Sequence, residues 1–302
     1  MERFFANILL KRGGMLAAFI ELGRPWNGVI VALLTIVGAM LAIQAVPPAF
    51  FIMVGALATF IVYTAATILN DVYDIEPDKI NMPYRPLERG SIAKSTAIRM
   101  SFFLYIIAIL GSFAVSPVYF VSILVMSLVS VTYSLPPFSA KDRGFLGNIV
   151  LGVSMIFTSM YAGYALVTNS MVPSYEFLIV LSLFTASFCL ISVLKDLKDI
   201  YGDRINKKLT FAVRHDKNIS VLVSFVGTAI LFYTMYLIDL YFIRTALFLY
   251  TSFAIVMLLV ILELVSYKKF SIEMGEKTWA FARIILMFLA LSIFTFSFFK
   301  FA

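Results

Sequence analysis

The sequence has few of the residues on which most soluble enzymes rely. It contains one histidine, one cysteine and two tryptophans, and only 14% of its 302 residues are charged. The lone Cys189 excludes an intrachain disulfide, and the apolar run around it predicts a packing role. The lone His215 lies in a charged run and is expected to be solvated, so it supports neither a Ser-His-Asp triad nor a zinc site. The sequence also lacks a Gly-rich phosphate loop of the P-loop type.

Apolar residues, in contrast, are in large excess. They make up 62% of the chain, whereas an ordinary soluble domain has about 45–50% apolar and about 25% charged residues. A soluble fold could not bury that much apolar surface, so lipid must be the solvent for most of the chain. We therefore expect an all-α integral membrane protein in which residues 1–302 form a single domain.

Apolar runs of about 17–25 residues predict the individual spans. Two proline-containing pairs, Pro47-Pro48 and Ser116-Pro117, predict tight turns between the first and second and between the third and fourth spans. We expect nine transmembrane helices around one central cavity, at residues 27–45, 49–69, 97–114, 117–135, 146–168, 177–194, 219–238, 242–265 and 279–299.

Lysine and arginine are distributed unequally between the two sides of this predicted bundle. Of the 24 such residues, all but Arg244 and Lys300 fall on the side of the N-terminus and the long connections. This asymmetry predicts that the N-terminus and these connections are cytoplasmic and that the C-terminus lies outside. Topology thus explains the net charge of +7, and we expect no nucleic-acid partner. Residues Met1–Arg12 show no signal-peptide pattern and predict an amphipathic helix on the membrane surface.

Two of the cytoplasmic connections begin with matched aspartate triplets. One lies at the start of the 70–99 connection and the other, 125 residues later, at the start of the 195–218 connection. The spacings of three and four residues would place each set of carboxylates on one face of a helix. The members are Asp71, Asp74 and Asp78 in the first triplet, and Asp196, Asp199 and Asp203 in the second.

Carboxylates crowded at a membrane boundary repel one another, and a bound cation relieves that repulsion. Oxygen ligands favour Mg²⁺, which typically bridges a few carboxylates to substrate phosphates. Two facing clusters would hold metal ions on either side of one diphosphate, with nearby Lys and Arg taking the remaining charge. Two alternatives are solvated aspartates that cap helices and a cation pathway. A pathway usually places acidic residues deep within the spans, where Glu263 is the first to occur.

Four motifs follow one another along the chain. They are Arg24-Pro25-x-Asn27; Asn70-Asp71-x-x-Asp74-x-x-x-Asp78-x-Ile80-Asn81-x-Pro83-x-Arg85-Pro86-x-x-x-Gly90; Tyr133-Ser134-x-Pro136-Pro137 with Lys141, Gly144 and Gly147-Asn148; and Lys195-Asp196-x-x-Asp199-x-x-Gly202-Asp203-Arg204. In this order they resemble the UbiA superfamily of intramembrane prenyltransferases over nearly the whole chain. The sequence departs from many members in placing Tyr133 and Lys141 eight residues apart rather than four, and in having Tyr201 where Glu is common.

The resemblance implies a Mg²⁺-dependent prenyltransferase whose cavity opens sideways to lipid beneath a cap formed by the Asp-bearing connections. The implied metal ligands are Asn70, Asp71, Asp74, Asp78, Asp196, Asp199 and Asp203. The implied substrate-binding residues are Asn27, Arg85, Lys141, Asn148, Lys195 and Arg204. The implied catalytic residues are Asp71, Asp74, Asp199, Asp203, Lys141 and Tyr133, the last touching the diphosphate or shielding the allylic cation.

The predicted reaction transfers an isoprenyl group, geranylgeranyl or similar, from an isoprenyl diphosphate to a lipophilic acceptor by ionisation and condensation. The acceptor stays open between an aromatic quinone precursor and geranylgeranylglyceryl phosphate, with a chlorin or haem also within the family's range. A transporter is one competing hypothesis, and it would require ionisable residues near the bilayer midplane. A non-catalytic lipid-binding protein is the other, and two intact triplets argue against it. The oligomeric state is not predicted.

Overall fold

The structure is a computed structural model that describes residues 15–268 and 272–302. Over these residues nine helices are long and apolar enough to cross a membrane, as predicted, and the ends of their spans lie within five residues of the predicted ones, with the ninth span taken as Lys277–Phe301 of α15. The segment Met1–Arg12, predicted to be an amphipathic helix, lies outside the described residues. The spans are α3 (Pro25–Ile43), α4 (Ala49–Tyr73), α6 (Lys94–Phe113), α7 (Pro117–Ser134), α8 with η2 and α9 (Phe145–Thr168), α10 with η3 (Tyr175–Lys198), α13 with η4 (Lys217–Ile243), α14 (Ala246–Lys268) and α15 (Ile272–Phe301).

Local sequence signals explain where several of these helices begin. Proline occupies the first turn of α3 and α7, where its missing N–H costs nothing. The hydroxyl of Ser116 caps α7 by accepting the backbone N–H of Tyr119 at 3.1 Å. Asp216 caps α13 in the same way, accepting from the backbone N–H of Ile219 at 2.8 Å. The tight turn predicted at Ser116-Pro117 is confirmed, because α6 and α7 pack as a hairpin across it.

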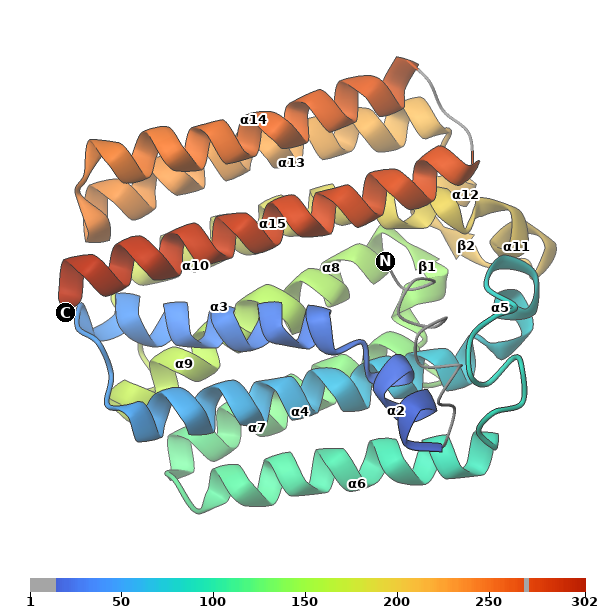
Figure 1. Ribbon diagram of the computed structural model, residues 1–302, viewed down its shortest axis with the longest axis horizontal. Coiled ribbons are helices and arrows are strands. Elements are labelled where there is room, and N and C mark those ends of the chain that lie inside the picture. Colours follow the sequence, from blue (N-terminus) through green and yellow to red (C-terminus); the bar gives the residue numbers. More distant parts are fainter. Residues whose placement is uncertain (1–14, 269–271) are drawn as a thin grey trace.

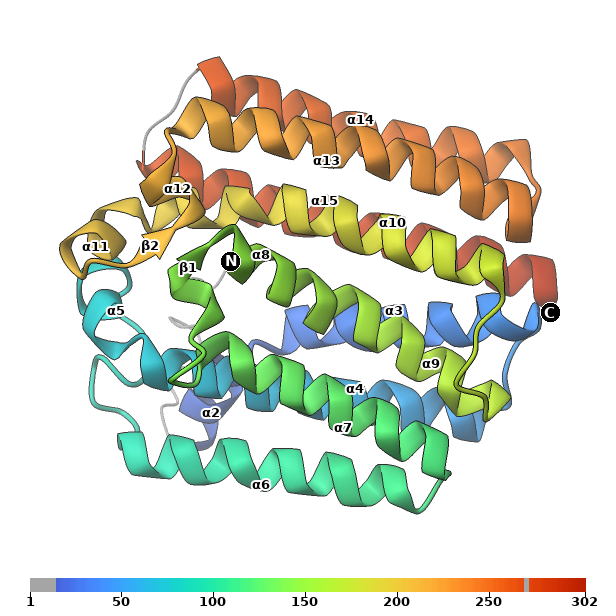
Figure 2. The same ribbon diagram turned by 180° about the vertical axis from the view of Figure 1, so that it is seen from behind.

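The helices lie side by side, and α3 runs through the middle of the bundle between α4, α9 and α15 (Figures 1 and 2). Its crossing with α9 depends on glycine at both helices. A Cβ at Gly38 would lie 2.2 Å from the carbonyl oxygen of Met160, and one at Gly163 would lie 1.9 Å from that of Thr35. The two backbones therefore approach too closely for any side chain, as in other membrane helix pairs with small residues at the contact.

The offset between the aspartate triplets extends to the spans that carry them. Shifted by 125 residues, α4 coincides with the span Tyr175–Lys198 to within one residue, and α6 falls within Lys217–Ile243. The outer helices turn apolar side chains to the outside: Leu110 of α6 is 65% exposed and Leu258 of α14 is 54% exposed. Such surfaces are stable in lipid, which confirms the all-α membrane architecture.

A cap of short elements covers one end of the bundle, and the C-terminus lies at the other end (Figure 1). A two-residue parallel ladder joins two of its connections, with Arg143 paired to Leu209 and Gly144 to Thr210. Helix α2 lies at the same end, where Glu21 accepts two hydrogen bonds from Arg89. The cap elements are α2 (Met15–Gly23), α5 (Ile75–Asn81), η1 (Ala140–Asp142), β1 (Arg143–Gly144), α11 (Ile200–Ile205), β2 (Leu209–Thr210) and α12 (Phe211–Arg214).

Candidate active site

One cavity of about 260 Å³ lies beneath the cap and extends into the bundle. Its capped end is polar, because five aspartates of the two triplets line it: Asp74, Asp78, Asp196, Asp199 and Asp203. Its deeper wall is apolar and includes Leu34, Met155, Ile156, Phe184, Phe188 and Leu286. The predicted central cavity is therefore present, and it joins a highly charged end to a hydrocarbon-like wall.

The first triplet does not lie on one helix face, contrary to the prediction from its spacing. Helix α4 ends at Tyr73 and α5 starts at Ile75, so the chain turns at Asp74, which has φ −106° and ψ 7°. Asn70 and Asp71 still belong to α4, inside the span rather than in the connection. The turn arises because the apolar run ends here, and it aims Asp74 and Asp78 into the cavity while Asp71 stays behind the wall.

The second triplet has the same shape. The 3-10 helix η3 (Ser192–Lys198) carries Lys195 and Asp196, and the chain turns at Asp199, which has φ −102° and ψ −2°, before α11. Asn81 links the two triplets across the cavity: its side-chain amide donates to the Asp199 carbonyl at 3.3 Å, and its side-chain oxygen accepts the Gly202 N–H at 3.0 Å. A Cβ at Gly202 would lie 2.4 Å from that oxygen, so any other residue here would displace the Asn81 side chain.

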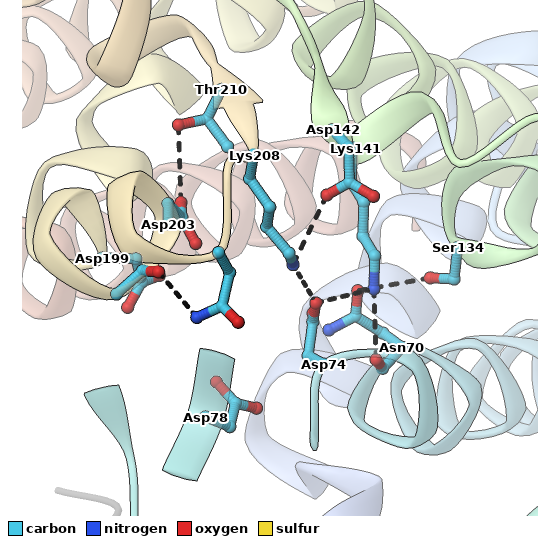
Figure 3. Close-up of polar contacts among 12 residues, drawn as sticks. Asn70, Asp74, Asp78, Ser134, Lys141, Asp142, Asp199, Asp203, Lys208 and Thr210 are labelled. Carbon is cyan, nitrogen blue, oxygen red and sulfur yellow. Dashed lines mark hydrogen bonds and ion pairs between the residues drawn. The ribbon is translucent and has the colours of Figure 1, made fainter. Parts of the chain in front are cut away.

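Cations surround the first triplet. Asp74 forms ion pairs with Lys141 at 2.9 Å and with Lys208, whose ammonium also lies 3.4 Å from Asp142 (Figure 3). These lysines come from two connections that the β1–β2 ladder holds together. Behind them, the guanidinium of Arg85 contacts both Asp78 and Asp71, the latter at 3.3 Å, and Arg24 also pairs with Asp71.

The cations of the second triplet come from its own sequence. Lys195 pairs with its neighbour Asp196, and Lys198 pairs with its neighbour Asp199 at 3.1 Å. The hydroxyl of Thr210 donates to Asp203 at 3.4 Å (Figure 3). The two triplets thus face one another with cations between and around them, which is the arrangement that a polyanion such as a diphosphate requires.

Burial and neighbouring charges shift the acidic groups in opposite directions. Burial disfavours ionisation of Asp74, but Lys141 and Lys208 outweigh it and hold the pKa of Asp74 well below its ordinary value. Burial raises the pKa of Asp78 to about 7, reinforced by the other triplet carboxylates and opposed by Arg85. Burial and then the charge of Asp199 raise the pKa of Asp203 to about 7. Without a bound cation, the two clusters therefore resist full ionisation.

The lysines show the corresponding shifts. Burial lowers the pKa of Lys141, although the nearby carboxylate of Asp74 opposes that change. Burial also disfavours the charge of Lys208, but Asp74 and Asp142 outweigh it and raise the pKa of Lys208 above its ordinary value.

These donors fit Mg²⁺ by chemistry. They are carboxylate oxygens, which Mg²⁺ prefers, and their mutual repulsion is what a divalent cation relieves. Within residues 15–268 and 272–302, however, no three acidic or metal-binding side chains are grouped closely enough to hold one ion. That grouping is not required, because Mg²⁺ usually keeps several waters and binds through one or two carboxylates together with substrate phosphates.

The predicted Tyr/Lys motif also reaches the cavity. Tyr133 belongs to the last turn of α7, and the ammonium of Lys195 lies 5.9 Å from its ring centroid. Lys141 comes from η1 and is buried, donating to the backbone carbonyl and to the side-chain oxygen of Asn70, both at 3.3 Å. Tyr133, Lys141 and Asn70 all line the cavity beside Asp74.

Three predicted site residues lie outside the cavity lining. Asp71 is buried behind the wall and pairs with Arg24 and Arg85, which do line the cavity. Asn148 is buried and donates to the Ser192 hydroxyl at 3.0 Å, so it joins α8 to the start of η3. Arg204 is exposed on α11, since it follows the inward-facing Asp203 and projects away from it.

Sequence reasoning assigned no role to Lys208 or Arg283, both of which line the cavity. From the sequence, both belong to the lysines and arginines that the positive-inside rule explains.

The fold and the site define the class of protein. It is a polytopic membrane protein with one cavity suited to ligands that have an anionic head and a hydrocarbon tail. The chain belongs to the UbiA prenyltransferase family, whose family model matches residues 31–298. The resemblance drawn from the four motifs is confirmed, and so is the prediction of a prenyltransferase. The transporter and lipid-binding alternatives gain no support.

Relatives and solved structures agree with this assignment. Digeranylgeranylglyceryl phosphate synthase from Sulfolobus acidocaldarius is 30% identical over 221 residues, which cover 72% of this chain and 76% of that protein. The protein of the same name from Thermococcus sibiricus is 31% identical over 198 residues, covering 66% of this chain and 68% of that protein. A structure of a UbiA homologue from Archaeoglobus fulgidus bound to DMAPP and Mg²⁺ has a TM-score of 0.69 at 15% identity, covering 94% of this chain and 98% of that one. A structure of a UbiA homologue from Aeropyrum pernix K1 has a TM-score of 0.71 at 13% identity, covering 89% and 96%. At these identities the structural likeness supports the fold.

Proposed function

We propose that this protein transfers a geranylgeranyl group from geranylgeranyl diphosphate to geranylgeranylglyceryl phosphate, in the membrane and with Mg²⁺. The observation that carries the proposal is the convergence of five aspartates from the two triplets, together with lysines and arginines, on one end of a cavity whose deeper wall is apolar. The names of the relatives favour the glyceryl phosphate acceptor over the aromatic one. A bound DMAPP and Mg²⁺ in the Archaeoglobus fulgidus homologue support the donor and the metal.

The diphosphate of the donor would lie between the two triplets. Asn70, Asp74 and Asp78 would serve the metal on one side, and Asp196, Asp199 and Asp203 would serve the metal on the other. Bound Mg²⁺ would supply charge neutralisation of the diphosphate as the allylic C–O bond breaks. Asp71 and Asn148 would act from behind, by orienting Arg85 and η3 respectively.

Lys141, Lys208, Arg85 and Lys195 would stabilise the departing diphosphate. Each now contacts an aspartate of the triplets, which a metal ion would engage on binding. The ammonium and guanidinium groups would then be available to donate to the phosphate oxygens. Because they are held in place before the substrate arrives, little reorganisation is needed when charge develops on the leaving group.

The apolar wall would hold the isoprenyl chain and keep water from the allylic cation. Phe184 and Phe188 stand one turn apart on α10, and Leu34 and Ile156 complete the wall beside them. Tyr133 lies at the boundary between this wall and the charged end, where its ring would shield the cation. The glycerol hydroxyl of the acceptor would form the new C–O bond to the allylic carbon as the C–O bond to the diphosphate breaks, and the hydroxyl proton would pass to the released diphosphate.

The same proposal places the cap in the cytoplasm and the C-terminus outside. All Lys and Arg residues except Arg244 and Lys300 belong to the cap side, which the positive-inside rule assigns to the cytoplasm. Accessibility of single cysteines introduced at Glu76 and Phe299 to a membrane-impermeant reagent tests this orientation. Labelling of the Glu76 position in intact cells would contradict it.

The reaction is tested by donor binding and turnover with the protein in detergent. Asp74→Asn and Asp199→Asn are expected to abolish Mg²⁺-dependent binding of geranylgeranyl diphosphate and product formation. Glu76→Gln is the matched control, because Glu76 lies in the same motif but is exposed and pairs with Lys79 at the surface. If wild type binds the donor equally well with and without Mg²⁺, or the two Asp variants behave like Glu76→Gln, the two-triplet site is wrong.

A further inference from the structure

Helix α15 gives the cavity a wall that belongs to neither triplet. Its lining residues are Trp279, Ala280, Arg283, Leu286 and Ala290. Positions separated by three, four and seven residues lie on one helix face, so these side chains form a single stripe. Of the five, Arg283 alone carries a charge. On other faces of the helix, Phe281 and Phe288 are more than half exposed, toward lipid.

Arg283 is an arginine within a membrane span, and such residues are costly unless they serve a site or a water-filled cavity. Its guanidinium donates to the side-chain oxygen of Asn27 at 3.4 Å, across the contact between α15 and α3. Asn27 also lines the cavity, and both residues are partly buried. A planar guanidinium beside an amide offers several donors in fixed directions, which suits the oxygens of a phosphate.

The diphosphate end already has its own cations. Lys141 and Lys208 contact Asp74, Arg85 contacts Asp78, and Lys195 contacts Asp196. Lys141, Lys208 and Arg85 belong to connections on the cap and Lys195 belongs to η3 at the end of α10, whereas Arg283 belongs to α15. The cavity therefore has a separate cation on the wall formed by α15 and α3.

Beyond Arg283, away from the cap, the cavity is lined by apolar residues of α15 and α3. Leu286 and Ala290 follow Arg283 on α15, and Ile30 and Leu34 follow Asn27 on α3. Alanine at Ala280 and Ala290 leaves space along this wall, since neither side chain extends beyond Cβ. An anionic head at Arg283 would thus place a hydrocarbon tail between α15 and α3, directed away from the cap.

We propose that Arg283, held by Asn27, binds the phosphate headgroup of the prenyl acceptor, separately from the diphosphate of the donor. The inference rests on the proposed function and adds to it the recognition of an acceptor by its phosphate monoester. With its phosphate at Arg283 and its prenyl chain along this wall, the acceptor would present its free glycerol hydroxyl to the allylic carbon of the donor.

The test compares two acceptors in the full-length protein: geranylgeranylglyceryl phosphate and geranylgeranylglycerol, which lacks the phosphate. Arg283→Gln is expected to raise KM for the phosphorylated acceptor by about 10- to 100-fold, the effect of losing a hydrogen-bonded charge. KM for geranylgeranylglycerol and Kd for geranylgeranyl diphosphate with Mg²⁺ are expected to stay within about twofold of wild type. Arg283→Lys should recover part of the loss, since it restores the charge without the planar fork.

Lys277→Gln is the control, because it removes a positive charge from an exposed position on the same helix. An unchanged KM for the phosphorylated acceptor in Arg283→Gln would overturn the inference, and so would a loss of donor affinity as large as the loss for the acceptor. Equal losses for the two acceptors would also overturn it. A wild type that neither binds the donor with Mg²⁺ nor forms product would instead defeat the proposed function itself.

Discussion

Asp74 and Asp199 occupy the same backbone position in two copies of one motif. Their φ and ψ angles are −106° and 7° for Asp74 and −102° and −2° for Asp199. The backbone N–H of each donates to the carbonyl three residues earlier at 3.2 Å. The third aspartate of each triplet has its partner seven residues later, Arg85 for Asp78 and Thr210 for Asp203. The two motifs share a backbone design, and the side chains around it have diverged.

The first prediction concerns Lys208. Lys208→Gln removes a cation that contacts Asp74, so we expect the affinity for geranylgeranyl diphosphate with Mg²⁺ to fall by about tenfold, as for loss of a charged hydrogen bond. Mg²⁺ alone should bind at least as tightly as to wild type, because the lysine no longer competes for the carboxylate. Calorimetry measures both. Lys207→Gln is the control, because Lys207 is the exposed neighbour of Lys208. If Lys208→Gln bound the donor as tightly as wild type, Lys208 would neutralise Asp74 but would not contact the diphosphate.

The second prediction concerns pH. Asp78 and Asp203 have pKa values raised from 3.8 to about 7, so in metal-free protein they favour the folded state at low pH. That contribution is lost as the pH rises from about 4 to about 7, since the unfolded chain then releases protons that the folded chain retains. A metal ion binds the ionised form, so Mg²⁺ affinity should increase about tenfold per group between pH 6 and pH 8.

The measurement is the rise in melting temperature that Mg²⁺ produces, taken at several pH values. We expect this rise to be larger at pH 8 than at pH 6. Asp78→Asn should flatten the profile. A Mg²⁺ effect that does not change between these pH values would show that neither carboxyl has to lose a proton for the metal to bind.

The third prediction concerns the crossing of α3 and α9. A Cβ at Gly163 would lie 1.9 Å from the Thr35 carbonyl oxygen and 2.8 Å from the Ala39 nitrogen, both backbone atoms. Gly163→Ala must therefore push the helices apart, and we expect a loss of about 3 kcal/mol or more, at the upper end of overpacking. At Gly111 on α6, no described atom lies within 4 Å of the added Cβ. Gly111→Ala should be neutral or stabilising by up to about 1 kcal/mol, and equal melting temperatures for the two variants would contradict the packing argument.

The fourth prediction concerns Glu263, a fully buried carboxyl in α14. Its Oε1 accepts hydrogen bonds from the hydroxyls of Ser224 and Thr228 on α13, the latter at 2.8 Å, while its Oε2 has no hydrogen-bond partner among the described residues. Glu263→Gln keeps the acceptor and should leave stability nearly unchanged. Glu263→Leu should lower it by about 0.6–2 kcal/mol, the range for hydrogen bonds between membrane helices. Thermal unfolding in detergent measures both, with the lipid-exposed Val265→Ala as control; a larger loss in the Gln variant would mean that the negative charge itself is needed.

The sequence was sufficient for the spans and the triplets because both are local patterns. An apolar run indicates a span wherever it occurs. The second triplet repeats the spacing of Asp71, Asp74 and Asp78, which indicates that the two motifs are related. The break at Asp74 and Asp199 was missed because a helical spacing also fits a short helix, a turn and a second short helix. Only the contacts of the cap select the broken form.

Long-range partners could not be read from the sequence. Lys208 is 134 residues from Asp74 and resembles any other cytoplasmic lysine until the fold brings them together. Arg283 is 256 residues from Asn27 for the same reason. Conversely, Arg204 is part of the fourth motif and follows Asp203 directly, but adjacent residues on a helix point in different directions. Proximity in the chain is thus a poor guide to which cations reach the cavity.

The two-residue ladder between β1 and β2 has a mechanical consequence. It fastens the connection that carries Lys141 to the connection that carries Lys208, and both ammoniums meet at Asp74. The positions of the two lysines are therefore coupled, because a displacement of either connection also moves the other. The two lysines would bind an incoming polyanion together. The losses of binding free energy in the two single-lysine variants should therefore be strongly non-additive in the double variant.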